Sequence, residues 1–184
     1  MNILTTIMKR HSVRSYLDKN VEEEKIEQIC MAGLHSPSAR NRQPYRVIVV
    51  TERDLLDKVV TANDRINFWM KEAPVIFVIC SSVKSEGREQ NKFIDVGIMT
   101  ENMMLMAADL DLGTCACAAF DQQKIKDIFG IPADYFPVLC LPCGYPSQKY
   151  RQGIDVTKIY EKVVHTATHY KGRSTDDIFT RNQF

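Results

Sequence analysis

The sequence lacks several features that would place it in a familiar functional class. No stretch approaches the about 18 consecutive apolar residues of a membrane-spanning helix, and the opening MNILTTIMKRHS contains no apolar core of a signal peptide. There is no GxGxxG, P-loop or GxSxG motif. Charge of one sign is not in excess, because 24 Lys and Arg residues stand against 23 Asp and Glu residues. We therefore expect neither a membrane partner nor a nucleic-acid partner.

The chain is long enough for one domain, and its cysteines indicate a reducing compartment. It has 184 residues, of which 45% are hydrophobic, and we predict a single domain over 1–184. Without an export signal, reduced thiols in the cytoplasm are the expected state. All six cysteines stand in apolar or helical contexts: Cys30, Cys80, Cys115, Cys117, Cys140 and Cys143.

Helical periodicity alternates with short apolar runs along the chain. Helices are predicted over 2–9, from a cap at Asn20 to Leu34, around 55–60, over 93–112 with Gly113 ending it, and from a cap at Asp121 to Phe129 before Gly130. Strands are predicted at 47–50, 74–80, 114–119 and 137–142, the first two of them buried. This alternation favours a layered α+β fold with a sheet of about four to five strands. The polar tail 147–184 is predicted to be an arm that lies over a partner subunit.

Two polar clusters flank the second predicted helix. Arg10, Ser12 and Arg14 point the same way if the chain is extended there, and two guanidinium groups with a hydroxyl suit a phosphate or another oxyanion. A solvated basic turn explains the same residues. In the second cluster, Asn41 and Gln43 carry donors and acceptors that suit the edge of a planar heterocycle. An ordinary polar turn explains that stretch too.

Three motifs, taken in order, are similar to one known family. RHSVRSY with HSPSARNRQPYRVIVV, then DVGIMTENMMLMAADLDLGTCACAAF, then LPCGYP resemble the FMN-dependent nitroreductases over essentially the whole chain. The resemblance implies a three-layer fold with a mostly antiparallel central sheet. It also implies a homodimer with an exchanged C-terminal arm and two FMN sites built from both chains. Tyr45 stands where this family more often has Trp, and His11 replaces an Arg.

The resemblance also implies which residues bind the cofactor. The first cluster would hold the phosphate and pyrimidine side of FMN, and the second would contact the flavin of the partner chain. Backbone N–H groups of two small residues would lie near the reactive flavin edge, and two cations after the GYP turn would add phosphate contacts. The full set is Arg10, His11, Ser12, Arg14, Pro37, Ser38, Asn41, Gln43, Ala118, Ala119, Lys149 and Arg151.

The implied reaction is a two-step transfer from NADH or NADPH through FMN to a nitroaromatic, a quinone or a similar small acceptor. Because the flavin carries the chemistry, we predict no catalytic side chain. A flavin-binding storage or sensing module without turnover is the main alternative. A metal or cluster site made of the pairs at 115/117 and 140/143 is a third hypothesis. His165 and His169 in HTATH lack the glutamate of the HExxH zinc motif.

Overall fold

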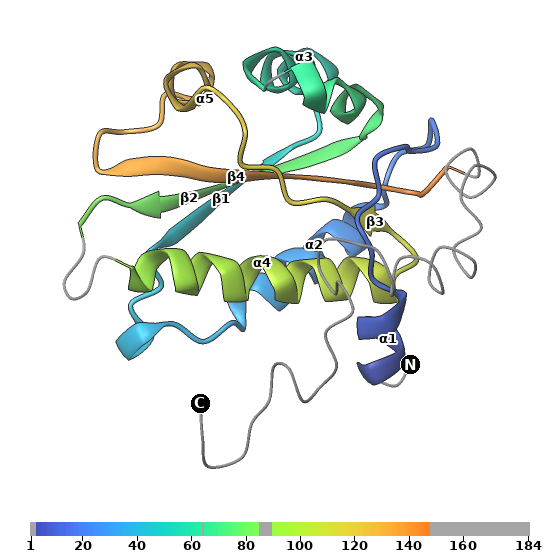
Figure 1. Cartoon of the computed structure of the whole chain (residues 1–184), viewed down its shortest axis with the longest axis horizontal. Helices are drawn as coiled ribbons and strands as arrows, with labels where there is room; N and C mark the ends of the chain where they lie inside the picture. The colour runs from blue at the N-terminus through green and yellow to red at the C-terminus, as the bar shows by residue number, and fades with distance from the viewer. Residues whose placement is uncertain (1–2, 64, 85–89, 148–184) are drawn as a thin grey trace, which may run out of the picture. The chain divides into compact units, whose positions relative to one another are not determined.

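The structure is a computed structural model that describes residues 3–63, 65–84 and 90–147 (Figure 1). The predicted arm, apart from Ser147, therefore lies outside the described residues, and the single-domain prediction over 1–184 stays a prediction. The helices are α1 (Ile3–Lys9), α2 (Glu23–Leu34), α3 (Arg53–Ala62), α4 (Asn91–Asp109) and α5 (Gln122–Phe129), with 3-10 helices η1 (Ala39–Asn41) and η2 (Arg65–Glu72). The strands are β1 (Tyr45–Val50), β2 (Val75–Ser82), β3 (Gly113–Thr114) and β4 (Tyr135–Gly144).

The four described strands form one antiparallel sheet in the order β1-β2-β4-β3. Phe77 of β2 pairs with Val49 on one side and with Leu141 on the other, so β2 is central. The prediction of a mostly antiparallel sheet with about four to five strands is confirmed. The implied exchange of a C-terminal arm stays a prediction, because it falls on residues 148–184.

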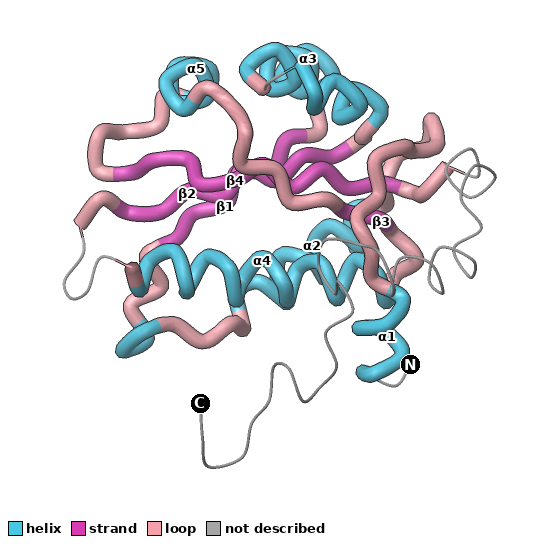
Figure 2. Tube along the Cα trace, viewed as in Figure 1, coloured by secondary structure: helices cyan, strands magenta, loops and turns pink. Residues whose placement is uncertain are grey.

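Helices cover both faces of the sheet, as Figures 1 and 2 show: α3 and α5 on one face, α2 and α4 on the other. Alternate residues of β2 explain this arrangement, since side chains of a strand point to opposite faces in turn. Ile76 and Val78 belong to the core under α3 and α5, whereas Phe77 and Ile79 belong to the core against α2 and α4. The apolar run of β2 is therefore buried on both faces.

Strand β1 is less buried than its sequence predicts. In the described sheet it pairs only with β2 and is an edge strand. Tyr45 and Val50 are buried, but the Val49 side chain is 40% exposed. The prediction of a buried strand at 47–50 is therefore wrong, because a run of β-branched residues does not distinguish an edge strand from a central one.

The cap predicted for α2 is wrong, whereas both ends predicted for α5 are confirmed. Helix α2 follows Glu22, which makes no side-chain capping bond, so Asn20 is not its cap. Helix α5 begins after Asp121, whose carboxylate accepts from the Lys124 N–H, and it ends at Gly130 in the left-handed conformation with φ 60°. These two features are as predicted.

Gly113 does not end the long helix α4. Asp111 instead adopts the left-handed conformation, with φ 63°. Gly113 belongs to β3, where a Cβ atom would lie 2.4 Å from Cγ2 of Val13. The glycine is therefore required by the close approach of the N-terminal segment and not by a helix cap.

Strand β3 is shorter than the predicted strand 114–119. Gly113 and Thr114 pair with β4. Further along the described chain, one isolated bridge between Cys117 and Cys140 has the same register. In an uninterrupted ladder Cys115 would pair with Pro142, which has no N–H to donate. The proline therefore breaks the ladder, and the stretch that follows is held by a single backbone pair.

Candidate functional site

The first polar cluster is attached to β3 through its backbone. Ser12 forms a parallel bridge with Thr114, and the Val13 N–H donates to the Thr114 carbonyl oxygen at 2.9 Å. The Val13 side chain is buried in the core, while Ser12 is half-buried and Arg14 exposed. The predicted alternation of the segment is therefore confirmed at these residues. The bridge to Thr114 places Ser12 beside β3, and Arg10 and Arg14 stand on the same segment on either side of it.

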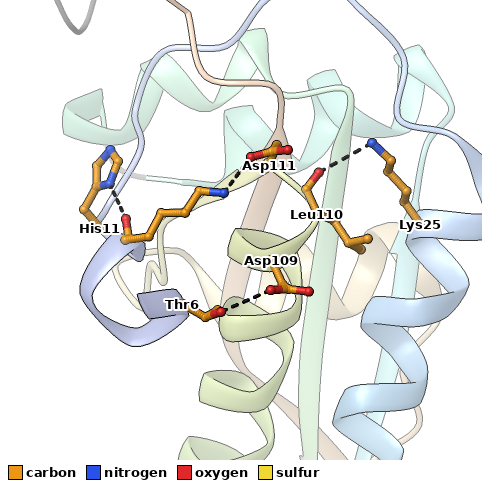
Figure 3. Close-up of polar contacts among 7 residues, drawn as sticks. Thr6, His11, Lys25, Asp109, Leu110 and Asp111 are labelled. Atoms are coloured by element: carbon orange, nitrogen blue, oxygen red, sulfur yellow. Dashed lines mark hydrogen bonds and ion pairs between the residues drawn. The ribbon is translucent and has the colours of Figure 1, made fainter. Parts of the chain in front are cut away.

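Helix α1 and the end of α4 hold the start of this cluster (Figure 3). The Thr6 hydroxyl donates to Asp109 Oδ1 at 3.1 Å, and Lys9 forms an ion pair with Asp111. His11 is exposed, and its Nδ1 donates to the Lys9 carbonyl oxygen at 3.0 Å. The imidazole is therefore bound to the end of α1.

Arg10 lies close to α4. Its Nε atom lies 3.3 Å from Oε1 of Glu101, and its side chain is 29% exposed. An ion pair of this kind limits the rotamers of a long side chain, so that less side-chain entropy is lost when it binds a ligand.

Helix η2 was not recognised in the sequence as part of the site. The Arg14 guanidinium lies 6.0 Å from the ring centre of Trp69, and Tyr16 lies 6.4 Å from the same ring. The Glu72 carboxylate accepts from the Ser15 hydroxyl and from the Tyr16 N–H, each at 3.1 Å. The mixed aromatic and polar composition of 65–72 was the only local sequence signal for this contact, and composition alone does not predict which residues the helix contacts.

Ala118 and Ala119 form a short exposed stretch with free backbone donors. Within the described ranges, neither N–H donates to another residue. The stretch is held by the Cys117–Cys140 pair before it and by a bond from the Asp121 N–H to the Ala62 carbonyl after it. Its small side chains allow a ring to approach the backbone closely.

Asn67 of η2 is a second residue that sequence reasoning missed. Its Nδ2 atom donates to the Ala119 carbonyl oxygen at 3.2 Å, across a separation of 52 residues. The same helix therefore contacts the N-terminal segment through Trp69 and the alanine stretch through Asn67. Helix η2 therefore connects the first polar cluster with Ala118 and Ala119.

The second polar cluster is the loop Ser36–Pro44, and it is attached to α4. The Ala39 N–H donates to the buried Asp95 carboxylate at 3.0 Å, and Asn102 Nδ2 donates to the Ser36 hydroxyl at 2.8 Å. Pro37 and Ser38 line an open pocket together with Ala39, Asn91, Ile94, Asp95 and Ile98.

The tip of this loop has an unusual backbone. Arg40, Asn41 and Gln43 adopt positive φ angles of 54°, 54° and 50°. Gln43 donates from its N–H to the Ser38 hydroxyl and from Nε2 to Asn41 Oδ1, at 2.9 and 3.1 Å. Non-glycine residues in this region are strained, and such strain is common where a loop holds a ligand.

The remaining predicted residues have different outcomes. Lys149 and Arg151 lie outside the described residues, as do His165 and His169. Cys115, Cys117 and Cys140 belong to the core under α3 and α5, whereas Cys143 belongs to the core on the opposite face of the sheet. Across the described residues there is no group of three or more His, Cys, Asp or Glu placed to hold a metal ion.

Known proteins resemble this chain in sequence and in this arrangement of helices around an antiparallel sheet. The family model described as the nitroreductase family matches residues 7–63 and 58–145. The chain belongs to the nitroreductase family. The matched ranges contain both polar clusters and the stretch at Ala118 and Ala119. The resemblance seen in the sequence motifs is therefore confirmed.

Relatives of this nitroreductase-family chain include proteins of known structure. A relative from Methanothermobacter thermautotrophicus, provisionally named NADH dehydrogenase/NAD(P)H nitroreductase, is 31% identical and covers 80% of this chain and 79% of its own. A nitroreductase family protein from Clostridium novyi NT has a TM-score of 0.75 at 28% identity, over 82% of this chain and 88% of that one. An FMN-dependent nitroreductase from Clostridium difficile R20291 has a TM-score of 0.70 at 26% identity, over 78% and 87%.

None of the helices in the described part of this chain is both long and apolar enough to cross a membrane.

Proposed function

We propose that this chain is an NAD(P)H-dependent flavin oxidoreductase that binds FMN and passes reducing equivalents to a small organic acceptor. Membership of the nitroreductase family supports this activity, and so do the names of its relatives. The observation that carries the proposal is the chemistry of the donors. Arg10, Ser12 and Arg14 stand on one segment that pairs with Thr114 of β3. The N–H groups of Ala118 and Ala119, which donate to no other described residue, stand on a stretch joined to the same helix η2 that contacts Arg14.

These donors fit the two ends of FMN. A phosphate carries negative charge and suits the guanidinium groups of Arg10 and Arg14, with the Ser12 hydroxyl as a further donor. The polar edge of the flavin ring carries neutral acceptors, which suit the backbone N–H groups of Ala118 and Ala119. Hydride acceptance from a nicotinamide and electron delivery to an acceptor are the chemistry that FMN supplies when it is bound.

The protein's own contribution is orientation. Glu101 holds Arg10 near its binding position, and Trp69 lies beside Arg14, so both cations are partly ordered before a ligand arrives. The bond from Asn67 to the Ala119 carbonyl oxygen fixes the plane of the peptide that follows. Preorganised donors lower the entropic cost of binding. No side chain near the cluster needs to act as an acid or a base in this proposal.

We also propose a homodimer whose two flavin sites each draw on both chains. Several large apolar side chains are more than a third exposed on the layer of α1, α2 and α4, and such patches mark interaction surfaces. They are Ile3, Leu4, Ile7, Met8, Met31, Leu34, Phe93, Ile94 and Ile98. The loop Ser36–Pro44 borders this surface through its pocket with Ile94 and Ile98. It would present Pro37, Ser38, Asn41 and Gln43 to the flavin of the second chain.

Flavin content and anaerobic reduction test the proposal together. The purified protein should be yellow or should become yellow with added FMN. NADH or NADPH should bleach the flavin, and a nitroaromatic or a quinone should restore the colour. A colourless protein that does not take up FMN would refute the binding. Bound flavin that neither nicotinamide reduces would favour a storage or sensing module instead.

Arg53→Ala is a suitable control variant for these measurements. Arg53 forms an exposed ion pair with Asp57 on the solvent side of α3, in the helix layer that covers the other face of the sheet. It should leave FMN content and reduction unchanged, whereas Arg10→Ala should lower the FMN content.

A further inference from the structure

Two arginines in the loop Ser36–Pro44 are not used by the proposed flavin chemistry. Arg40 and Arg42 are exposed, and neither guanidinium group makes a hydrogen bond, an ion pair or a ring contact with a described residue. Every other arginine whose side chain the structure describes contacts a carboxylate, a carbonyl oxygen or an aromatic ring: Arg10, Arg14, Arg46 and Arg53. The pair at the loop tip is therefore available for an anionic ligand.

The loop that carries these two arginines is held in its middle and at its end. The Ala39 N–H donates to the Asp95 carboxylate at 3.0 Å, and Asp95 is only 4% exposed. The Ser82 N–H donates to the Pro44 carbonyl oxygen at 2.7 Å. Arg40 itself adopts the left-handed region, with φ 54° and ψ 26°, a conformation that persists only where surrounding contacts hold it. The two guanidinium groups therefore extend from a fixed backbone, which lowers the entropic cost of binding.

The amide side chains next to the two arginines bond to each other. Asn41 Oδ1 accepts from Gln43 Nε2 at 3.1 Å, and the Gln43 N–H donates to the Ser38 hydroxyl at 2.9 Å. The stretch Ser36–Pro44 contains no Asp or Glu. In Rossmann-type sites a carboxylate binds the ribose 2′-hydroxyl of NAD, whereas an arginine accommodates the 2′-phosphate of NADP. The loop offers the second kind of group and not the first.

We propose that Arg40 and Arg42 bind the 2′-phosphate of NADPH, so that this chain uses NADPH in preference to NADH. This donor specificity rests on the proposed function, in which Asn41 of the same loop lies at a flavin site. Asn41 stands between the two arginines in the sequence. A nicotinamide that passes hydride must stack on the flavin ring, so the rest of the donor crosses the loops beside that ring. The exposed cations of this loop are then placed to meet it.

The 2′-phosphate suits two guanidinium groups better than the other phosphates of the donor do. It is a monoester with a charge of about −1.5 to −2 near neutral pH, and its free oxygens can accept paired hydrogen bonds from planar guanidinium groups. The pyrophosphate is esterified at both phosphorus atoms, has fewer free oxygens and is common to NADH and NADPH. Binding of the 2′-phosphate by two arginines therefore distinguishes the two donors.

Steady-state kinetics with each donor test this specificity in the FMN-loaded protein. The kcat/KM of the unaltered protein should be higher for NADPH than for NADH. Arg40→Gln and Arg42→Gln should each lower kcat/KM for NADPH about five- to tenfold, between the effect of an exposed ion pair and that of a hydrogen bond to a charged group. Their kcat/KM for NADH should stay within about twofold, because NADH lacks the 2′-phosphate and exposed charges otherwise contribute little. Arg42→Lys should give an intermediate value, because lysine keeps the charge but not the planar fork.

Isothermal titration with adenosine 2′,5′-bisphosphate and with adenosine 5′-monophosphate measures the same contact without flavin reduction. The bisphosphate should bind more tightly, and each Gln variant should lower its affinity about five- to tenfold while the affinity for the monophosphate stays unchanged. The loss should shrink as the salt concentration rises. Arg53→Gln is the matched control, because Arg53 is exposed on α3 and paired with Asp57. It should change the affinity for neither nucleotide, and the FMN content should be the same in all these variants.

Three results would overturn the proposal. The first is an unaltered protein that reacts with NADH as efficiently as with NADPH. The second is an equal loss for both donors in the Gln variants, which, with a shift from dimer to monomer on size-exclusion chromatography, would assign the arginines to ion pairs with a second copy of this chain. The third is an affinity for adenosine 2′,5′-bisphosphate that neither variant lowers. A protein that fails to bind FMN but binds this nucleotide through Arg40 and Arg42 would refute the proposed function and leave the phosphate site intact.

Discussion

Replacing Arg10 by alanine should weaken FMN binding by about 1.5–3 kcal/mol, the range for a hydrogen bond to a charged group. This corresponds to a roughly 10- to 150-fold rise in Kd. The structure explains why the loss should not be smaller. Arg10 is only 29% exposed, and its Nε lies 3.3 Å from Glu101, so the variant removes a cation and leaves a carboxylate beside the site. That carboxylate repels a phosphate.

The contribution of the carboxylate can be separated by a double-mutant cycle. Glu101→Gln alone should change Kd little, because the residue is 51% exposed and such ion pairs contribute about 0.2–1 kcal/mol. Arg10→Ala combined with Glu101→Gln should recover part of the lost affinity, because the repelling charge is gone. Arg53→Ala is the control for general loss of positive charge.

Quenching of flavin fluorescence on titration with the protein measures each Kd. The titrations are carried out at low and at physiological salt, because exposed charges are screened as ionic strength rises. The loss caused by Arg10→Ala should shrink at higher salt. A Kd within twofold of the unaltered protein at low salt would refute the placement of Arg10 at the phosphate.

Two further predictions concern the frame of the site. Gly113→Ala should lower the free energy of unfolding by about 1–3 kcal/mol in urea titration, because the new Cβ would lie 2.4 Å from Val13. Gly97→Ala, which has nothing within 4 Å, should be neutral or stabilising by up to about 1 kcal/mol, and equal losses in both variants would contradict the steric reason. Glu22 accepts from the Tyr145 hydroxyl, which lowers its pKa from 4.5 to about 2. A lowered pKa means that this stabilisation is present above pH 4.5 and is lost as the pH falls toward about 2, so Tyr145→Phe should flatten the stability profile in that window, measured by urea unfolding.

Sequence patterns gave correct predictions where the structure depends on residues within one helix or strand. Asp121 and Gly130 begin and end α5 because a cap and a left-handed residue act within one turn of the helix. The apolar run 74–80 predicted a buried strand, and every residue of β2 from Val75 to Cys80 is buried. The polar clusters could also be found in the sequence, since each lies within about ten consecutive residues.

Errors arose where the partner of a residue is distant in the chain. The exposure of Val49 depends on the order of strands in the sheet, which no run of residues encodes. The short β3 depends on the position of Pro142 across the ladder. Asn67 was missed because its partner, Ala119, lies 52 residues away.

The sequence by itself determined the family of this protein and the layered α+β class, and it supplied the residues that we propose to bind FMN. These depend on motif order and on periodicity, which are properties of consecutive residues. Only the tertiary structure decided that Gly113 makes room for Val13, and that the segment with Arg10, Ser12 and Arg14 pairs with Thr114 of β3. The physical reason is that such contacts join segments about 100 residues apart, and their register is set by backbone pairing in the folded sheet.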